Sequence, residues 1–287
     1  MLRKGIALAA FGLTLVAAPA ALAAGGAAPL KHTEFSFEGP LGKFEPAQLQ
    51  RGYKVYREVC AACHSMDLLF FRNLGQKGGP FYDPKYPNPN DNPYVKAIAA
   101  EYQINDIDSE TGDVIQRPGT SADKFPAPFP NEPAARASNG GALPPDLSVM
   151  AKARHHGPQY IYSLLGSGYV APPKGLTVAP GQYYNKYFPG ALASAWSGDP
   201  DHVPAGGVLA MAPPLAPDKV TFDDGTKATV PQMAEDVAAF LTWTAEPQLV
   251  KRRQTGWAVM VFLLFATVLA YLSKQQIWSA VKPKTKD

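Results

Sequence analysis

The chain is poor in cysteine, with only two among its 287 residues. Both belong to one pentapeptide, Cys60-Ala61-Ala62-Cys63-His64. A zinc site would need two further ligands that no other cysteine can supply, and a thioredoxin-like redox motif would not explain the adjoining histidine. The pattern Cys-x-x-Cys-His is instead typical of the covalent attachment of a c-type haem.

The spacing within this pentapeptide suits haem attachment chemically. On one helical turn the sulfurs of Cys60 and Cys63 lie near one edge, where they can form thioethers with the two haem vinyl groups. His64 follows in position to ligate the iron from the proximal side. Because the pattern occurs once, we expect one haem c and exclude a two-haem chain. Neither cysteine is then left for a disulfide.

The first 24 residues, 1–24, have the character of a cleavable secretory signal. Arg3 and Lys4 precede an apolar run over 6–18, and small residues at 21–23 form an Ala-Leu-Ala cleavage sequence. The apolar run is too short to span a bilayer. We therefore expect export of the rest of the chain, the alternative being an uncleaved N-terminal anchor.

One long stretch without charge lies at 254–273, between Arg253 and Lys274. About 20 helical residues at about 1.5 Å each match a hydrocarbon core of about 30 Å, so we expect a single transmembrane helix. A helix buried in a protein core is the alternative. The charges on its two flanks are nearly balanced, so the orientation follows from the exported domain that precedes it. The expected domains are a periplasmic haem domain over 25–250, an anchor with its basic flank over 251–273 and a basic cytoplasmic tail over 274–287.

Proline is abundant, at 29 residues, and it clusters over 78–93, 118–145 and 172–217. Such runs interrupt helices and favour turns and extended loops. We therefore expect a mainly α fold, a c-type cytochrome helical core wrapped by long ordered loops, together with the C-terminal transmembrane helix.

Three helices are expected to build this core. The residues Leu49, Tyr53, Tyr56 and Cys60 form a helical stripe that leads to the haem motif, and Gly52 would allow another helix to approach closely. A second helix is expected over 231–245, beginning with a proline and ending before Pro247. A third is expected over 146–155 and on to 165, interrupted by Gly157-Pro158.

The exported domain is acidic, although the whole chain has a net charge of +3. When the signal, the anchor flank and the tail are set aside, 18 basic and 23 acidic side chains remain. An acidic cluster without an intervening cation indicates a field that steers cationic partners, an ordinary solvated loop being the alternative. We expect no nucleic-acid partner. The cluster comprises Glu101, Asp106, Asp108, Glu110 and Asp113.

The sixth ligand of the iron decides the chemistry of such a site. A methionine gives a high-potential electron carrier, whereas an open site gives gas binding or peroxide chemistry. Met211 lies in an apolar loop stiffened by Pro213 and Pro214, which would hold a thioether with little ordering cost. From the residues alone the alternatives stay open, and the candidates are Met150, Met211, His32, His155, His156 and His202.

Several further stretches together resemble the cytochrome c1 family, the haem c subunits of the ubiquinol–cytochrome c reductase (cytochrome bc1) complex. The most specific are Ala-Leu-Pro-Pro-Asp-Leu-Ser at 142–148, Met-Ala-Pro-Pro-Leu at 211–215 and Trp-x-x-Glu-Pro at 243–247 before the anchor. The resemblance covers nearly the whole mature chain, through the stretches 51–66, 139–148, 151–155, 160–165, 183–190, 211–215 and 235–247.

This resemblance implies roles for residues beyond the pentapeptide. Met211 occupies the position of the axial methionine, and Arg154 that of an arginine paired with a haem propionate. Tyr160 is expected to approach a propionate as well. A charge-assisted bond at Arg154 is chemically sensible, because a buried propionate would otherwise be costly.

The resemblance also implies a setting and a reaction. We expect a single-pass protein of the bacterial inner membrane that takes electrons from the Rieske iron–sulfur protein and passes them to a soluble or anchored cytochrome c. Its helix would pack on cytochrome b in a dimeric complex, and no substrate chemistry is expected in this chain itself. The alternatives are an independent membrane-anchored monohaem carrier and a haem sensor or peroxidase with an open sixth site.

Overall fold

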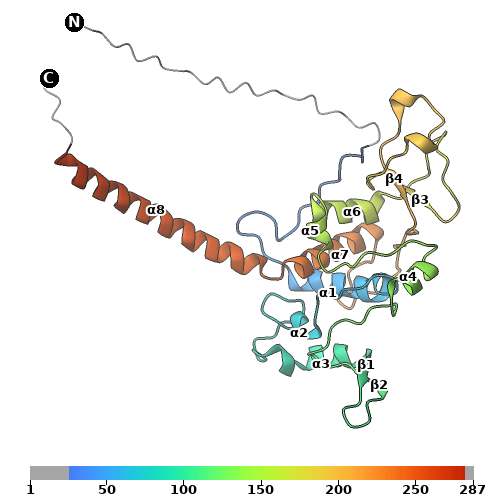
Figure 1. The fold of residues 1–287 in the computed structure, drawn as a ribbon, viewed down its shortest axis with the longest axis horizontal. Helices are drawn as coiled ribbons and strands as arrows, with labels where there is room; N and C mark the ends of the chain where they lie inside the picture. Colours follow the sequence, from blue (N-terminus) through green and yellow to red (C-terminus); the bar gives the residue numbers. More distant parts are fainter. Residues whose placement is uncertain (1–25, 282–287) are drawn as a thin grey trace, which may run out of the picture.

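The computed structural model describes residues 26–281. The expected signal over 1–24 and the end of the basic tail, 282–287, lie outside the described residues. The described part is mainly helical, as the prolines and the helical patterns predicted. Long loops connect short helices around a central helix pair, and one long helix leaves this domain (Figure 1).

The central pair consists of α1 (Pro46–Val55) and α7 (Val230–Ala245), which pack closely against each other. The predicted role of Gly52 is confirmed, because a Cβ atom there would lie only 2.1 Å from the backbone oxygen of Asp236. Asp236 is buried beside this crossing, and Arg51 donates to both of its carboxylate oxygens at 2.9 and 3.0 Å. A buried carboxylate is tolerable only with such a partner.

The predicted stripe leads to the haem motif, but not along one regular helix. Leu49, Tyr53 and Tyr56 are buried in the core. After Val55 the chain forms a π-helical turn, η1 (Tyr56–Cys60). A π-turn inserts one extra residue per turn and rotates the residues after it about the helix axis. The cysteines therefore point in a direction that the spacing of an α-helix alone does not give.

The third predicted helix is two helices, α5 (Met150–Ala153) and α6 (Gly157–Ser167). The break lies before Pro158, which stands in the first turn of α6 and so begins that helix instead of interrupting it. His156 between them has a left-handed backbone, with φ 50° and ψ 44°. Both helices pack against α7.

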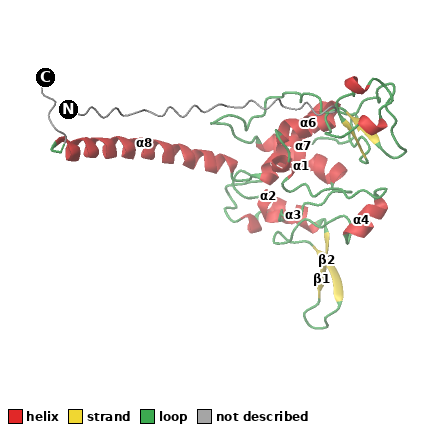
Figure 2. Ribbon diagram, turned by 45° about the horizontal axis from the view of Figure 1, so that its top comes forward, coloured by secondary structure: helices red, strands yellow, loops and turns green. Residues whose placement is uncertain are grey.

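The remaining elements are small. The helical ones are α2 (Phe71–Leu74), η2 (Pro89–Asp91), α3 (Pro93–Ala100), α4 (Glu132–Ser138), η3 (Ala193–Ala195) and η4 (Pro200–His202). Two antiparallel two-stranded sheets pair β1 (Gln103–Ile107) with β2 (Val114–Pro118) and β3 (Tyr183–Asn185) with β4 (Gly207–Leu209). The β1–β2 hairpin projects from the domain (Figure 2). Around β3 and β4 a second, small core forms from Leu176, Tyr184 and Leu192.

The long helix is α8 (Leu249–Ser279), which extends beyond the predicted span of 254–273 at both ends. Its 31 residues correspond to about 46 Å at 1.5 Å per residue. Within the described residues it is the one helix long and apolar enough to cross a membrane, and none of its apolar window is buried by the domain. The alternative of a buried core helix is therefore wrong.

Candidate haem site

The two cysteines lie at the end of the π-helical turn and in the turn that follows. The carbonyl oxygen of Cys60 accepts from the backbone nitrogens of Cys63 at 3.1 Å and His64 at 2.9 Å, so the pentapeptide is a closed turn. Neither cysteine is in a disulfide. Cys60 is partly buried and Cys63 is exposed. Burial, together with the neighbouring Cys63, raises the pKa of Cys60 to about 12.

His64 is oriented by one backbone hydrogen bond. Its Nδ1 atom lies 2.8 Å from the carbonyl oxygen of Pro145. Because a carbonyl oxygen can only accept, Nδ1 carries the proton and Nε2 keeps its lone pair. Burial lowers the pKa of His64 against the opposing effect of this bond, which favours the neutral ring. A neutral imidazole with Nδ1 bound to a carbonyl is the arrangement that metal-ligating histidines adopt.

Asp146 ties the loop that carries Pro145 to the segment after the haem motif. Its Oδ2 atom accepts from the Ser65 hydroxyl and the Asp67 backbone nitrogen, both at 2.8 Å, and its Oδ1 accepts from the Ser148 nitrogen at 2.8 Å. Burial opposes ionisation, but these hydrogen bonds hold the pKa of Asp146 below its usual range. The sequence placed Asp146 in a family-specific stretch without indicating this role.

The candidates for the sixth ligand differ in their burial and contacts. His32, His155, His156 and His202 are all exposed. His155 and His156 lie against each other, with ring centroids 4.0 Å apart, and His202 bonds to Asp199. Met150 packs against the main core. Met211 is partly exposed in the loop after β4, and its carbonyl oxygen accepts from the Tyr169 hydroxyl at 3.1 Å.

Arg154, Tyr160 and Tyr169 connect this loop to the break between α5 and α6. Burial raises the pKa of Tyr160, and the neighbouring Arg154 guanidinium opposes the rise. Burial and the nearby Tyr160 raise the pKa of Tyr169. The sequence did not predict a role for Tyr169, because its partner is a backbone carbonyl 42 residues away, which no side-chain pattern reveals.

Arg154 is an exposed cation that donates to the carbonyl oxygen of Ala153 at 3.0 Å and lies beside the Tyr160 side chain. Within 26–281 no carboxylate lies within 4 Å of its guanidinium. A guanidinium in this state is available to an external carboxylate, such as a propionate. Two thiols and an imidazole with its Nε2 unbound are what the attachment of a c-type haem requires, and this cation suits a propionate, so the residues fit the group.

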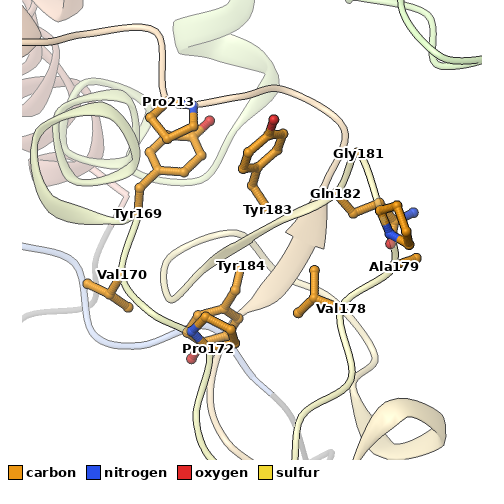
Figure 3. Close-up of a pocket in the computed structure, with 11 residues that line it drawn as sticks. Tyr169, Val170, Pro172, Val178, Ala179, Gly181, Gln182, Tyr183, Tyr184 and Pro213 are labelled. Atoms are coloured by element: carbon orange, nitrogen blue, oxygen red, sulfur yellow. The ribbon is translucent and has the colours of Figure 1, made fainter.

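A cavity of about 470 Å³ lies next to Pro213, two residues after Met211 (Figure 3). Tyr169 and Pro213 line it, together with Pro172, Tyr183 and Tyr184. None of Cys60, Cys63, His64 or Arg154 is among its lining residues. The cavity is therefore separate from the haem motif, and Tyr169 lies between it and Met211.

The acidic cluster is less uniform than its sequence indicated. Glu101 pairs with Arg57 at 2.7 Å, and Asp106 pairs with Arg117 at 2.6 Å across the β1–β2 hairpin. The Asp108 carboxylate accepts from the backbone nitrogens that follow it in the hairpin turn, at 2.8 and 3.2 Å. Two of the five charges are thus neutralised by cations distant in sequence, which weakens the predicted field.

Comparison with known proteins gives consistent matches along the chain. The cytochrome C1 family matches residues 35–281. Cytochrome c1 of Rhodospirillum rubrum is 40% identical over 292 residues, covering 96% of this chain and 97% of that protein. The mitochondrial cytochrome c1 haem protein of Saccharomyces cerevisiae is 41% identical over 250 residues, covering 87% and 72% respectively.

A third relative is a longer polypeptide. The protein named cytochrome b/c1 of Bradyrhizobium diazoefficiens is 40% identical over 303 residues, a match that covers 96% of this chain. The chain spans 41% of the length of that relative.

Proposed function

This chain belongs to the cytochrome C1 family, and on that basis we propose that it holds one covalently attached haem c through Cys60, Cys63, His64 and Met211 and transfers electrons within a cytochrome bc1 complex. The observation that carries the proposal is the 2.8 Å contact between His64 Nδ1 and the Pro145 carbonyl oxygen. It fixes the tautomer that a ligating histidine needs, and it arises between two segments 81 residues apart.

The bound haem c supplies a one-electron couple between ferric and ferrous iron. The residues of this chain bind it, orient it and set its potential. The Pro145 carbonyl holds the proton of His64 on Nδ1, and the Asp146 hydrogen bonds keep Pro145 in place. The thioether of Met211, a weak and soft donor, favours the reduced iron and so a high potential. Arg154 and Tyr160 are the proposed partners of a propionate.

The proposed membrane arrangement is supported by the length of α8 and by the contacts at its domain end. Arg252 pairs with Glu246, and Arg253 donates to the carbonyl oxygen of Phe37. Two of the three cations on this flank therefore contact the haem domain, and the proposed orientation rests on the exported domain that precedes α8. We infer a single crossing, with the haem domain over 25–250 in the periplasm and 274–287 in the cytoplasm.

The partners are inferred from the family and its relatives. A relative named cytochrome b/c1 joins both names in one polypeptide, which supports cytochrome b as the partner of α8. We propose the Rieske iron–sulfur protein as the electron donor, a soluble or anchored cytochrome c as the acceptor, and a dimeric complex.

Two measurements test this function. After extraction with acid acetone the pigment should stay with the chain, and Cys60→Ala with Cys63→Ala should release it. Solubilised membranes should yield the chain together with a b-type cytochrome and a Rieske protein. Purification of a chain that retains its haem but brings neither partner would favour an independent carrier. Carbon monoxide binding by the unmodified ferrous protein would favour the open sixth site.

A further inference from the structure

A short loop near the N-terminus of the described chain lies beside the first turns of α8 (Figure 1). We call residues 36–43 the 36–43 loop. It is closed at its base by a hydrogen bond from the Lys43 nitrogen to the Ser36 carbonyl oxygen, at 2.9 Å. Gly39 in its tip has φ 69°, a left-handed backbone that glycine adopts without strain. The loop is therefore a compact turn of fixed shape.

The base of the loop is anchored in the protein core. Phe37 stacks on Phe35 with ring centroids 4.9 Å apart and contacts Phe44 at 4.8 Å. Phe35 and Phe37 are buried. The tip differs, because Leu41 is 80% exposed. Leu41 is thus a large apolar side chain that is exposed on a turn whose base is anchored in the core.

Two side chains of α8 bind the backbone of the loop. Arg253 donates to the carbonyl oxygen of Phe37, and the indole Nε1 of Trp257 donates to that of Pro40 at 3.4 Å. Residues four apart share one face of a helix, so α8 holds the loop along a single face. Leu41 follows directly after Pro40, whose carbonyl oxygen accepts the bond from Trp257.

These contacts set the height of the loop along α8. Trp257 lies three residues inside the stretch without charge that begins at 254, about 4–5 Å along the helix axis. Tryptophan side chains at this depth belong to the interfacial belt of a membrane, between the headgroups and the acyl chains. The loop tip, bound to that indole, is at the same level.

We propose that the 36–43 loop is a second membrane contact, in which Leu41 enters the boundary between headgroups and acyl chains beside α8. The inference rests on the proposed function only in that α8 spans the membrane. Lys43 and Lys251 are exposed, and neither has an ion pair among the described residues, so they suit anionic phosphates. We assign lipid as the occupant because a stable protein interface buries about 800 Å² of surface on each side. One leucine on a narrow turn offers far less surface than that.

The loop also limits how α8 packs. The loop covers the face of α8 that carries Arg253 and Trp257, so a partner helix at this level must pack against another face. The haem domain is then tied to the membrane surface at two points instead of one, and two points restrict tilting of the domain about the base of α8.

The test uses the full-length, haem-loaded chain in vesicles of phosphatidylcholine and phosphatidylglycerol. Single nitroxide labels are placed through Leu41→Cys, Val114→Cys and Leu264→Cys, and power saturation compares access by oxygen with access by a water-soluble nickel chelate. The relaxation caused by the haem is measured without either reagent and subtracted. Val114 is the matched control, because it is 77% exposed on the β1–β2 hairpin, while Leu264 is 69% exposed within α8.

The expected result is a label at 264 that oxygen reaches far better than nickel, a label at 41 that also favours oxygen but less strongly, and a label at 114 that favours nickel. A water-like label at 264 would overturn the membrane span itself. A lipid-like label at 264 with a water-like label at 41 would overturn only the loop contact. Low access of both reagents to position 41 would mean that protein covers it, and would also overturn the proposal.

A second variant tests the hydrogen bond between Trp257 and the loop. Trp257→Phe keeps an aromatic ring at the interface but removes the indole donor to Pro40. The label at 41 should then become more mobile and shift towards nickel access, while the label at 264 should not change. An unchanged label at 41 would show that the hydrogen bond does not set the depth of the loop, which contradicts the inference.

Discussion

The crossing of α1 and α7 at Gly52 gives a stability prediction that can be worked out from the structure. A Cβ atom at position 52 would lie 2.1 Å from the Asp236 carbonyl oxygen and 2.7 Å from the Cβ of Phe240, whereas ordinary contact begins near 3.4 Å. Gly52→Ala therefore requires the two helices to separate by about 1 Å at the crossing, since a backbone oxygen cannot rotate away.

The loss of unfolding free energy in Gly52→Ala is the difference of two effects. Overpacking a close-packed site costs about 1–3 kcal/mol, and the clash with backbone places this site at the upper end. Alanine in a helix interior gains about 1 kcal/mol over glycine, so the net destabilisation is about 2 kcal/mol. For a domain of this size that lowers the Tm by about 4–8 °C, measured by far-ultraviolet circular dichroism of the full-length chain.

Two other helical glycines provide matched controls. A Cβ atom at Gly166 in α6 would meet the Ala234 Cβ at 3.3 Å, and one at Gly256 in α8 would meet nothing within 4 Å. Gly166→Ala should change the Tm little, and Gly256→Ala should leave it the same or raise it. If Gly52→Ala melted at the temperature of Gly166→Ala, the close approach of α1 and α7 would be refuted.

Three further predictions concern the haem site. Tyr169→Phe removes the hydrogen-bond donor to the Met211 carbonyl oxygen, and this bond is worth about 1 kcal/mol. The near-infrared band of sulfur-to-iron coordination should therefore weaken, and carbon monoxide binding should rise. Met211→Leu should abolish the band. Arg154→Gln should lower the midpoint potential in redox titration, because a nearby cation favours the reduced iron, and Lys152→Gln should not. The pKa of Asp146 is lower in the folded protein than in the unfolded chain. The ionised carboxylate therefore stabilises the fold above the unfolded pKa of about 4, and this contribution is lost as the pH falls through the folded pKa. The Tm deficit of Asp146→Asn should therefore be largest near neutral pH and shrink below about pH 4, and a constant deficit would contradict this role.

The sequence predicted the elements whose signals are local. The periodicity of Leu49, Tyr53 and Tyr56 predicted α1, and Pro231 with Pro247 predicted the limits of α7 within a residue or two. Both signals lie within a few residues of the element that they describe, which is why sequence reasoning reads them well.

The features that the sequence did not predict depend on distant partners. The pairing of Glu101 with Arg57 and of Asp106 with Arg117 requires the fold to bring the residues together. The π-helical turn that ends at Cys60 has no pattern of its own in the sequence. The bond from Tyr169 to a backbone carbonyl is equally invisible, because any residue could supply that acceptor.

A continuous path of packed elements links the two proposed iron ligands. The buried Asn185 donates to the Leu164 carbonyl oxygen in α6 at 3.0 Å, so the β3–β4 lobe that leads to Met211 is held to that helix. Because α6 packs on α7 and α7 packs on α1, the lobe is connected through three helices to the turn that carries His64. The prolines around Met211 reduce the freedom of the unfolded loop, which lowers the entropy lost when the loop is ordered. A weak thioether ligand can then stay near the iron because the protein holds its backbone, and not because the bond to the metal is strong.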